Sequence, residues 1–114
     1  MINIEGIKIK NNIFCAPMAG ITNKAYRKIA KEFGAGLTYT EMISDKAIVY
    51  KSKKTYEMMH TDKDESPVAI QLFGSDIDSL LGAVEYINKN SNADFLDINM
   101  GCPVNKVIKS KAGS

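Results

Sequence analysis

The strongest constraint in this sequence is the alternation of short apolar runs with helical or irregular segments. Four such runs are bounded by glycine, proline or polar residues: 13–16, 37–40, 67–73 and 94–99. An apolar run of this length fits a strand that is buried on both faces, as in a parallel sheet. Parallel neighbours need long crossover connections, which are almost always right-handed. The sequence therefore predicts an α/β fold with a parallel sheet.

The segments between these runs include two amphipathic helices. The first is predicted over 23–33, with Thr22 as its N-cap and Gly34 at its C-terminal end. Its apolar face consists of Tyr26, Ile29, Ala30 and Phe33. Its other face is expected to lie in solvent and carries Lys24, Arg27, Lys28 and Lys31. A longer helix is predicted over 75–87 and a short one over 45–50.

Length and composition narrow the fold and the class of protein. A doubly wound sheet and part of a (β/α)8 barrel both remain open, and a full barrel takes about 250 residues. The 114 residues are 45% hydrophobic and 25% charged, which excludes a disordered chain. The formal charge of +2 is too small to indicate nucleic-acid binding. The first residues lack the basic and long apolar regions of a signal peptide, so we do not expect secretion, and no apolar run reaches membrane-spanning length. The two cysteines lack metal-ligand spacing, so we expect a cytoplasmic chain with no metal.

Two candidate binding elements accompany the predicted strands. The segment 16–20 follows the first strand, at the end of the sheet where α/β proteins bind ligands. There Pro17 fixes the backbone, and the small Ala19 and Gly20 allow a flat ligand to approach; an ordinary turn is the alternative. Gln71 lies within the third strand, and its amide can both donate and accept at the polar edge of a flavin or base. Its alternative role is a structural hydrogen bond or an outward-facing position.

The loop after the fourth strand carries the strongest constellation, Asp97-Ile98-Asn99-Met100-Gly101-Cys102-Pro103. Asp97 and Asn99 share one side of the strand. Pro103 disfavours helical geometry at Cys102, which keeps that thiol in an extended loop. A free thiol is mostly protonated at neutral pH and can act as a general acid. The alternative is a packed cysteine, the role expected for Cys15. A basic stretch follows, with a possible phosphate role: Lys106, Lys109 and Lys111.

Taken together, these motifs resemble the tRNA-dihydrouridine synthases. The resemblance rests on Ala16-Pro17-Met18-Ala19-Gly20, Thr40-Glu41-Met42, Gln71 and the loop 97–103 with Lys106-Val107, in this order. It implies an FMN-dependent (β/α)8 barrel, followed by a small helical domain, that reduces the C5=C6 bond of uridines in tRNA with NADPH. It also implies that Pro17, Met18 and Ala19 lie against the isoalloxazine ring and that Gln71 contacts its polar edge. Asn99 would hold the uracil, and Cys102 would protonate C5.

The resemblance covers only the N-terminal half of such a barrel, about four β-α steps over 1–114. We therefore expect the C-terminal half and the helical tRNA-binding domain to be absent, and this piece alone to be inactive. Its inner face should be bare along strands containing Ile13, Leu37, Ile70 and Ile98, so it should self-associate. Another FMN barrel, of the dihydroorotate or dihydropyrimidine dehydrogenase type, is an alternative, as is an inactive isolated fragment. The Met-Gly-Cys-Pro sequence and Lys106 favour the tRNA enzyme.

Overall fold

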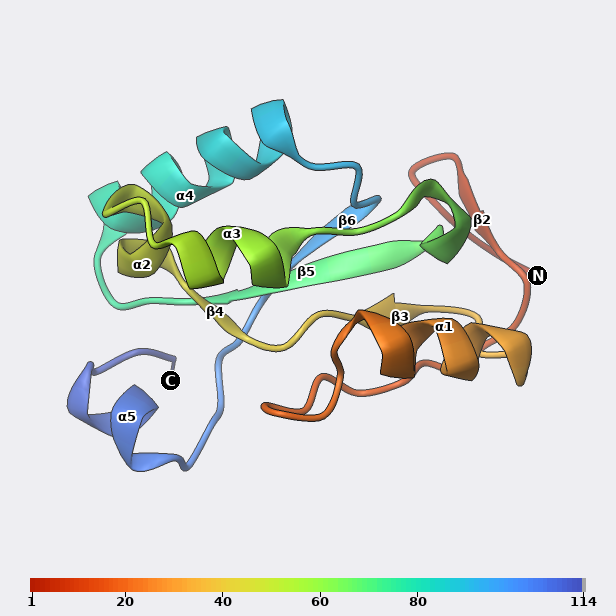
Figure 1. Ribbon diagram of the computed structural model, residues 1–114, viewed down its shortest axis with the longest axis horizontal. Coiled ribbons are helices and arrows are strands. Elements are labelled where there is room, and N and C mark those ends of the chain that lie inside the picture. The colour runs from red at the N-terminus through yellow and green to blue at the C-terminus, as the bar shows by residue number, and fades with distance from the viewer. Residues whose placement is uncertain (114) are drawn as a thin grey trace.

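The computed structural model describes residues 1–113 and shows an α/β fold built on a parallel sheet (Figure 1). The strands of this sheet are β3 (Thr38–Tyr39), β4 (Ile43–Ser44), β5 (Val68–Phe73) and β6 (Phe95–Ile98). Both β3 and β4 pair with one side of β5, and β6 pairs with the other. The predicted strand 13–16 is reduced to one parallel bridge, between Phe14 and Leu37. The paired segments thus lie side by side in chain order.

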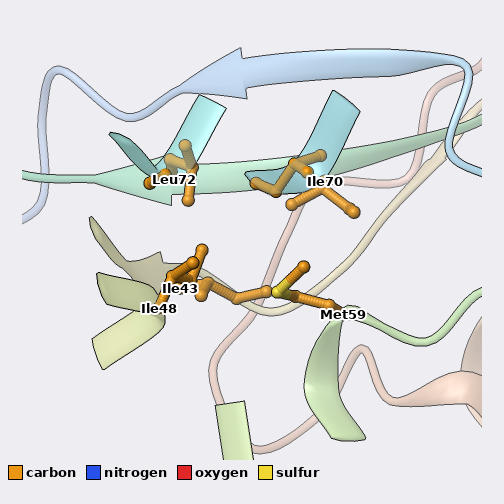
Figure 2. Packing of buried hydrophobic residues seen from close by; sticks show 7 residues of the cluster. Ile43, Ile48, Met59, Ile70 and Leu72 are labelled. Carbon is orange, nitrogen blue, oxygen red and sulfur yellow. The ribbon is translucent and has the colours of Figure 1, made fainter. Parts of the chain in front are cut away.

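Strand β5 forms the centre of the sheet, and all six of its residues are buried. Ile70 and Leu72 point to the side of the sheet that carries the helices, where they face Ile48 and Met59 of those helices and Ile43 of β4 (Figure 2). Each such fully buried side chain contributes roughly 1.5–3 kcal/mol relative to an exposed one. The sequence analysis placed Ile70 on a bare inner face, and this expectation is wrong because Ile70 is fully buried. It belongs to the helix-covered side of the sheet.

Within residues 1–113, three helices cover this side: α2 (Asp45–Val49), α3 (Lys53–Met59) and α4 (Ile77–Asn90). The predicted short and long helices correspond to α2 and α4, whereas α3 was not predicted. Helix α4 contributes Ala83 and Ile87 to the same apolar cluster. Asp76 caps its N-terminus by accepting a hydrogen bond from the Ser79 N–H.

A hairpin that the sequence analysis did not predict covers the other side of the sheet at the amino ends of its strands. It consists of β1 (Ile2–Ile4) and β2 (Ile7–Ile9), which are antiparallel. The turn places Glu5 and Gly6 at positive φ, as tight hairpin turns require. Ile9 packs against Leu37 and Ala69. Leu37 is consequently buried, which corrects the expectation that this position is bare.

Helix α1 (Lys24–Glu32) faces the opposite way from the prediction. Arg27, expected in solvent, is only 2% exposed, whereas Phe33, expected in the core, is 89% exposed. The reason is that Arg27 forms a buried ion pair with Glu65, at the end of the short 3-10 helix η1 (Lys63–Glu65). The N-cap is Asn23 rather than Thr22, because the Asn23 side chain accepts the Tyr26 N–H.

Helix α5 (Asn105–Lys109) follows the loop after β6 and lies apart from the other helices, at the carboxyl ends of the strands (Figure 1). Val107 is buried, and the rest of this helix is exposed. Within the part of the chain that the structure describes, no helix has the length and apolar character needed to cross a membrane.

Candidate functional site

A pocket of about 400 Å³ opens at the carboxyl ends of the strands, and we call it the Cys102 pocket. Its lining comes from three parts of the chain: the segment 17–19, the β3–β4 region, and β5 with the loop after β6. Five of the six predicted site residues line it, namely Pro17, Ala19, Gln71, Asn99 and Cys102. Met18 does not. The other lining residues are Met42, Ile98, Met100, Gly101, Pro103 and Val104.

The polar floor of the pocket is a chain of side-chain hydrogen bonds. Gln71 and Asp97 are register partners on β5 and β6, and the Gln71 amide donates to Asp97 Oδ2 over 2.6 Å. The Asn99 amide in turn donates to Gln71 Oε1 over 3.3 Å. Gln71 is largely buried, so leaving its amide unpaired would cost about 1–3 kcal/mol. Each carbonyl oxygen still has a second lone pair, and each NH₂ group a second hydrogen, for further contacts.

Asn99 also shapes the loop that carries the thiol. Its backbone N–H donates to Leu72 O at 2.8 Å, which extends the β5–β6 pairing by one residue. Its side-chain oxygen accepts the Gly101 N–H at 2.9 Å and so fixes the turn before Cys102. The Asn99 NH₂ group also makes a long contact, 3.8 Å, with the Met42 sulfur. Cys102 is a free, partly exposed cysteine on the rim of the pocket.

The segment 17–20 is held in place by two of its neighbours. The Thr22 hydroxyl accepts the Met18 N–H and donates to the Met18 carbonyl. The Glu41 carboxylate accepts the Gly20 N–H, so the Thr40-Glu41-Met42 motif orients the loop across the sheet. Gly20 has φ +75°, a left-handed conformation that glycine adopts readily. These bonds leave Pro17 and Ala19 facing the pocket, while the Met18 side chain is partly exposed elsewhere.

Sequence reasoning missed two contributors to this site. Met42 was recognised only as part of a motif, and Asp97 only as a neighbour of Asn99. The Asp97 carboxylate also acts on Tyr39, whose pKa is raised mainly by burial and secondarily by this negative charge. The register pairing between Gln71 and Asp97 could have been found only by aligning the third and fourth predicted strands. In residues 1–113 no group of His, Cys, Asp and Glu side chains is arranged to hold a metal ion.

Comparison with known proteins identifies the family to which this site belongs. A family model for dihydrouridine synthase matches residues 14–114, which is nearly the whole chain. The chain belongs to the dihydrouridine synthase family. The matched region includes every residue that lines the Cys102 pocket.

Individual relatives carry the same family name. A tRNA-dihydrouridine synthase B of Pasteurella multocida is 40% identical over 113 residues, covering 99% of this chain and 34% of that protein. Probable tRNA-dihydrouridine synthases of Rickettsia typhi and Treponema pallidum are 38% and 37% identical and are covered to 35% and 33% of their length. The chain therefore spans about a third of the length of these curated relatives.

Proposed function

We propose that residues 1–114 form the N-terminal part of an FMN-dependent (β/α)8 barrel that reduces uridine to 5,6-dihydrouridine in tRNA, with NADPH as the external reductant. The observation that carries this proposal is the Cys102 pocket. It brings an amide pair and a thiol together at the carboxyl ends of parallel strands, in a chain of the dihydrouridine synthase family. The paired segments follow one another along the sheet in chain order without reversal, which supports a barrel rather than a doubly wound sheet.

The residues present fit the ring portion of a flavin. Pro17 and Ala19 offer small side chains on one wall, and Gln71 offers an amide with hydrogen-bonding capacity left over. The pocket volume of about 400 Å³ falls in the usual range for cofactor and ligand sites, roughly 300–1,000 Å³. Barrels usually bind phosphate at the loops after strands seven and eight. Residues 1–114 would therefore contact the isoalloxazine ring of the flavin rather than its phosphate. Met18 has the least support among the proposed flavin contacts, because it does not line the pocket.

Within this pocket, each polar residue has a proposed task in the reaction. A bound flavin would supply the hydride that adds to C6 of the uracil. The Cys102 thiol would donate its proton to C5, so that one hydride and one proton together saturate the C5=C6 bond. Asn99 would hold the uracil through the second hydrogen of its NH₂ group, which now makes only the weak contact with the Met42 sulfur. Its bond to the Gly101 N–H would keep Cys102 in place at the same time.

The test uses the complete gene product that contains these residues. Purified protein should be yellow, release FMN on denaturation, and raise the dihydrouridine content of uridine-containing tRNA when NADPH is supplied. Free dihydroorotate and free uracil serve as control substrates in the same assay. Turnover of a free pyrimidine without any action on tRNA would contradict the proposal and favour a dehydrogenase of the dihydroorotate or dihydropyrimidine type.

A further inference from the structure

A second pocket, of about 450 Å³, adjoins the Cys102 pocket, and we call it the lysine pocket. The two pockets share three lining residues: Ala19, Met42 and Val104. The lysine pocket also lies at the carboxyl ends of the strands, between α3, α5 and the end of β5. Any group bound there is next to whatever occupies the Cys102 pocket. No task in the proposed reaction uses it.

The charged side chains of this pocket favour an anion. Lys54 comes from α3 and Lys106 from α5, and both side chains are exposed. Neither forms a salt bridge with any other residue in the range 1–113, whereas Lys24 and Lys28 are both paired with Asp62. Among residues 1–113, the one carboxylate in the lining belongs to Glu41, which already accepts the Gly20 N–H.

Two further features suit a phosphate group. The Lys106 ammonium lies 6.0 Å from the centre of the Phe73 ring, and that ring is buried at the end of β5. This cation–π contact favours a position of the ammonium near Phe73, which also lines the pocket. The hydroxyls of Ser44 and Ser52 accept backbone N–H bonds from Ala47 and Thr55, so the O–H of each is free to donate.

We propose that the lysine pocket binds the backbone phosphate of a nucleotide adjoining the target uridine, with Lys54 and Lys106 as its cationic contacts. This inference rests on the proposed function, because it takes the Cys102 pocket as the uridine site. A polynucleotide fits the geometry, since its phosphates are covalently linked to the base that enters the neighbouring pocket. A phosphate of NADPH has the same chemistry and is the source that the experiment must distinguish.

The experiment measures the affinity of the complete gene product for tRNA over a range of salt concentrations. The test variants are Lys54→Gln and Lys106→Gln. The matched controls are Lys53→Gln on α3 and Lys109→Gln on α5, because both lysines are exposed and neither lines the pocket. The sequence had grouped Lys109 with Lys106 as a phosphate contact, but only Lys106 lines this pocket. Each test variant should make the slope of log K against log salt shallower by about 1, the loss expected for one phosphate contact. Lys106→Arg should retain the wild-type slope.

A change confined to the two test variants, with NADPH reduction of the flavin unaltered, supports the inference. Equal changes in all four variants would show a diffuse basic surface and overturn it, as would no change in any. Unaltered tRNA binding with slower reduction by NADPH would assign the pocket to the reductant and overturn it too. Dihydrouridine formation by the wild-type protein is scored separately. If the Lys54 and Lys106 variants bind tRNA like the wild type, the lysine pocket proposal fails but uridine reduction is not disproved. If the wild-type protein does not reduce uridine, the comparison of tRNA binding among the variants can still be interpreted.

Discussion

The proposed proton donor is a single side chain, Cys102, and can be tested by substitution. In the complete gene product, Cys102→Ala should retain FMN and its reduction by NADPH, while dihydrouridine formation falls by roughly 10²–10⁴-fold, the usual loss for a general acid. The thiol lies on the rim of the pocket and not in the amide network, so its removal should leave flavin binding intact. Cys15→Ala is the matched control and should keep full activity. Near-normal tRNA reduction by Cys102→Ala would disprove the assignment.

Gln71 is the proposed flavin contact in the polar floor of the same pocket. Gln71→Leu keeps a similar volume but leaves Asp97 and Asn99 without their amide partner. We expect weaker flavin retention and a shifted reduction potential, because polar atoms at a buried flavin edge would lose a partner worth about 1–3 kcal/mol. Flavin titration and potentiometry measure both quantities. Unchanged values would mean that Gln71 only holds the two strands together.

The residues around this pocket could be predicted from sequence more fully than the contacts between them. Pro17, Gln71 and Cys102 follow or lie within separate strands, and parallel strands bring their carboxyl ends to one edge. That rule is sufficient to place such residues around one pocket. The bond from Gln71 to Asp97 depends on the register of two strands 26 residues apart in sequence, which local pattern does not encode.

At the level of helices and strands, the sequence reveals periodicity but not orientation. Helix α1 has one apolar and one basic face, and either could be turned inward. The orientation is decided by Glu65, 38 residues away, which supplies the buried partner of Arg27. The β1–β2 hairpin, by contrast, had a local signal. Isoleucines alternate on either side of a Glu-Gly turn, the pattern of two short strands.

The buried ion pair of α1 and η1 should be costly to break. Arg27 Nε lies 2.8 Å from Glu65 Oε1, and its other nitrogens donate to the carbonyls of Thr22 and His60. Arg27→Met would leave the Glu65 charge buried and uncompensated, so we expect a loss of about 3–5 kcal/mol in the free energy of unfolding. Urea denaturation measures it. Adding Glu65→Gln to this variant should recover part of the loss, and a loss below about 1 kcal/mol would contradict the expectation.

The exposed ion pairs of the same helix predict a pH dependence. Hydrogen bonds from Lys24 and then Lys28 hold the pKa of Asp62 well below its ordinary value. The folded state therefore binds fewer protons than the unfolded state, and stability must fall as pH drops below about 4. The Tm difference between wild type and Asp62→Asn should be present at pH 7 and should shrink below pH 4. Glu85→Gln, at an exposed residue without an ion pair in 1–113, is the control. A Tm difference that stays constant across this range would contradict the expectation.

At the scale of the whole molecule, one group of exposed apolar residues forms a patch beside α1. Ile13, Tyr26, Ile29 and Phe33 surround a hollow of about 300 Å³ between α1 and the segment that precedes it. Phe14 lies beside this hollow and pairs with Leu37 on one side. Its other side has no strand partner within residues 1–113. In a closed barrel, this edge and helix would contact the last strand and helix of the ring. The patch is therefore the surface that barrel closure would bury.

Residues 1–114 produced alone should therefore self-associate, bind FMN weakly and fail to reduce tRNA. An unpaired strand edge beside an exposed apolar patch favours association with another chain. Sedimentation and flavin titration measure the two properties. The double change Ile29→Glu and Phe33→Glu should shift the chain toward monomer, whereas Tyr50→Glu, at an exposed aromatic residue outside the patch, should not. A monomeric wild-type chain that binds FMN tightly and reduces tRNA would contradict this expectation. Such a result would mean that these residues need neither the rest of the barrel nor a second chain.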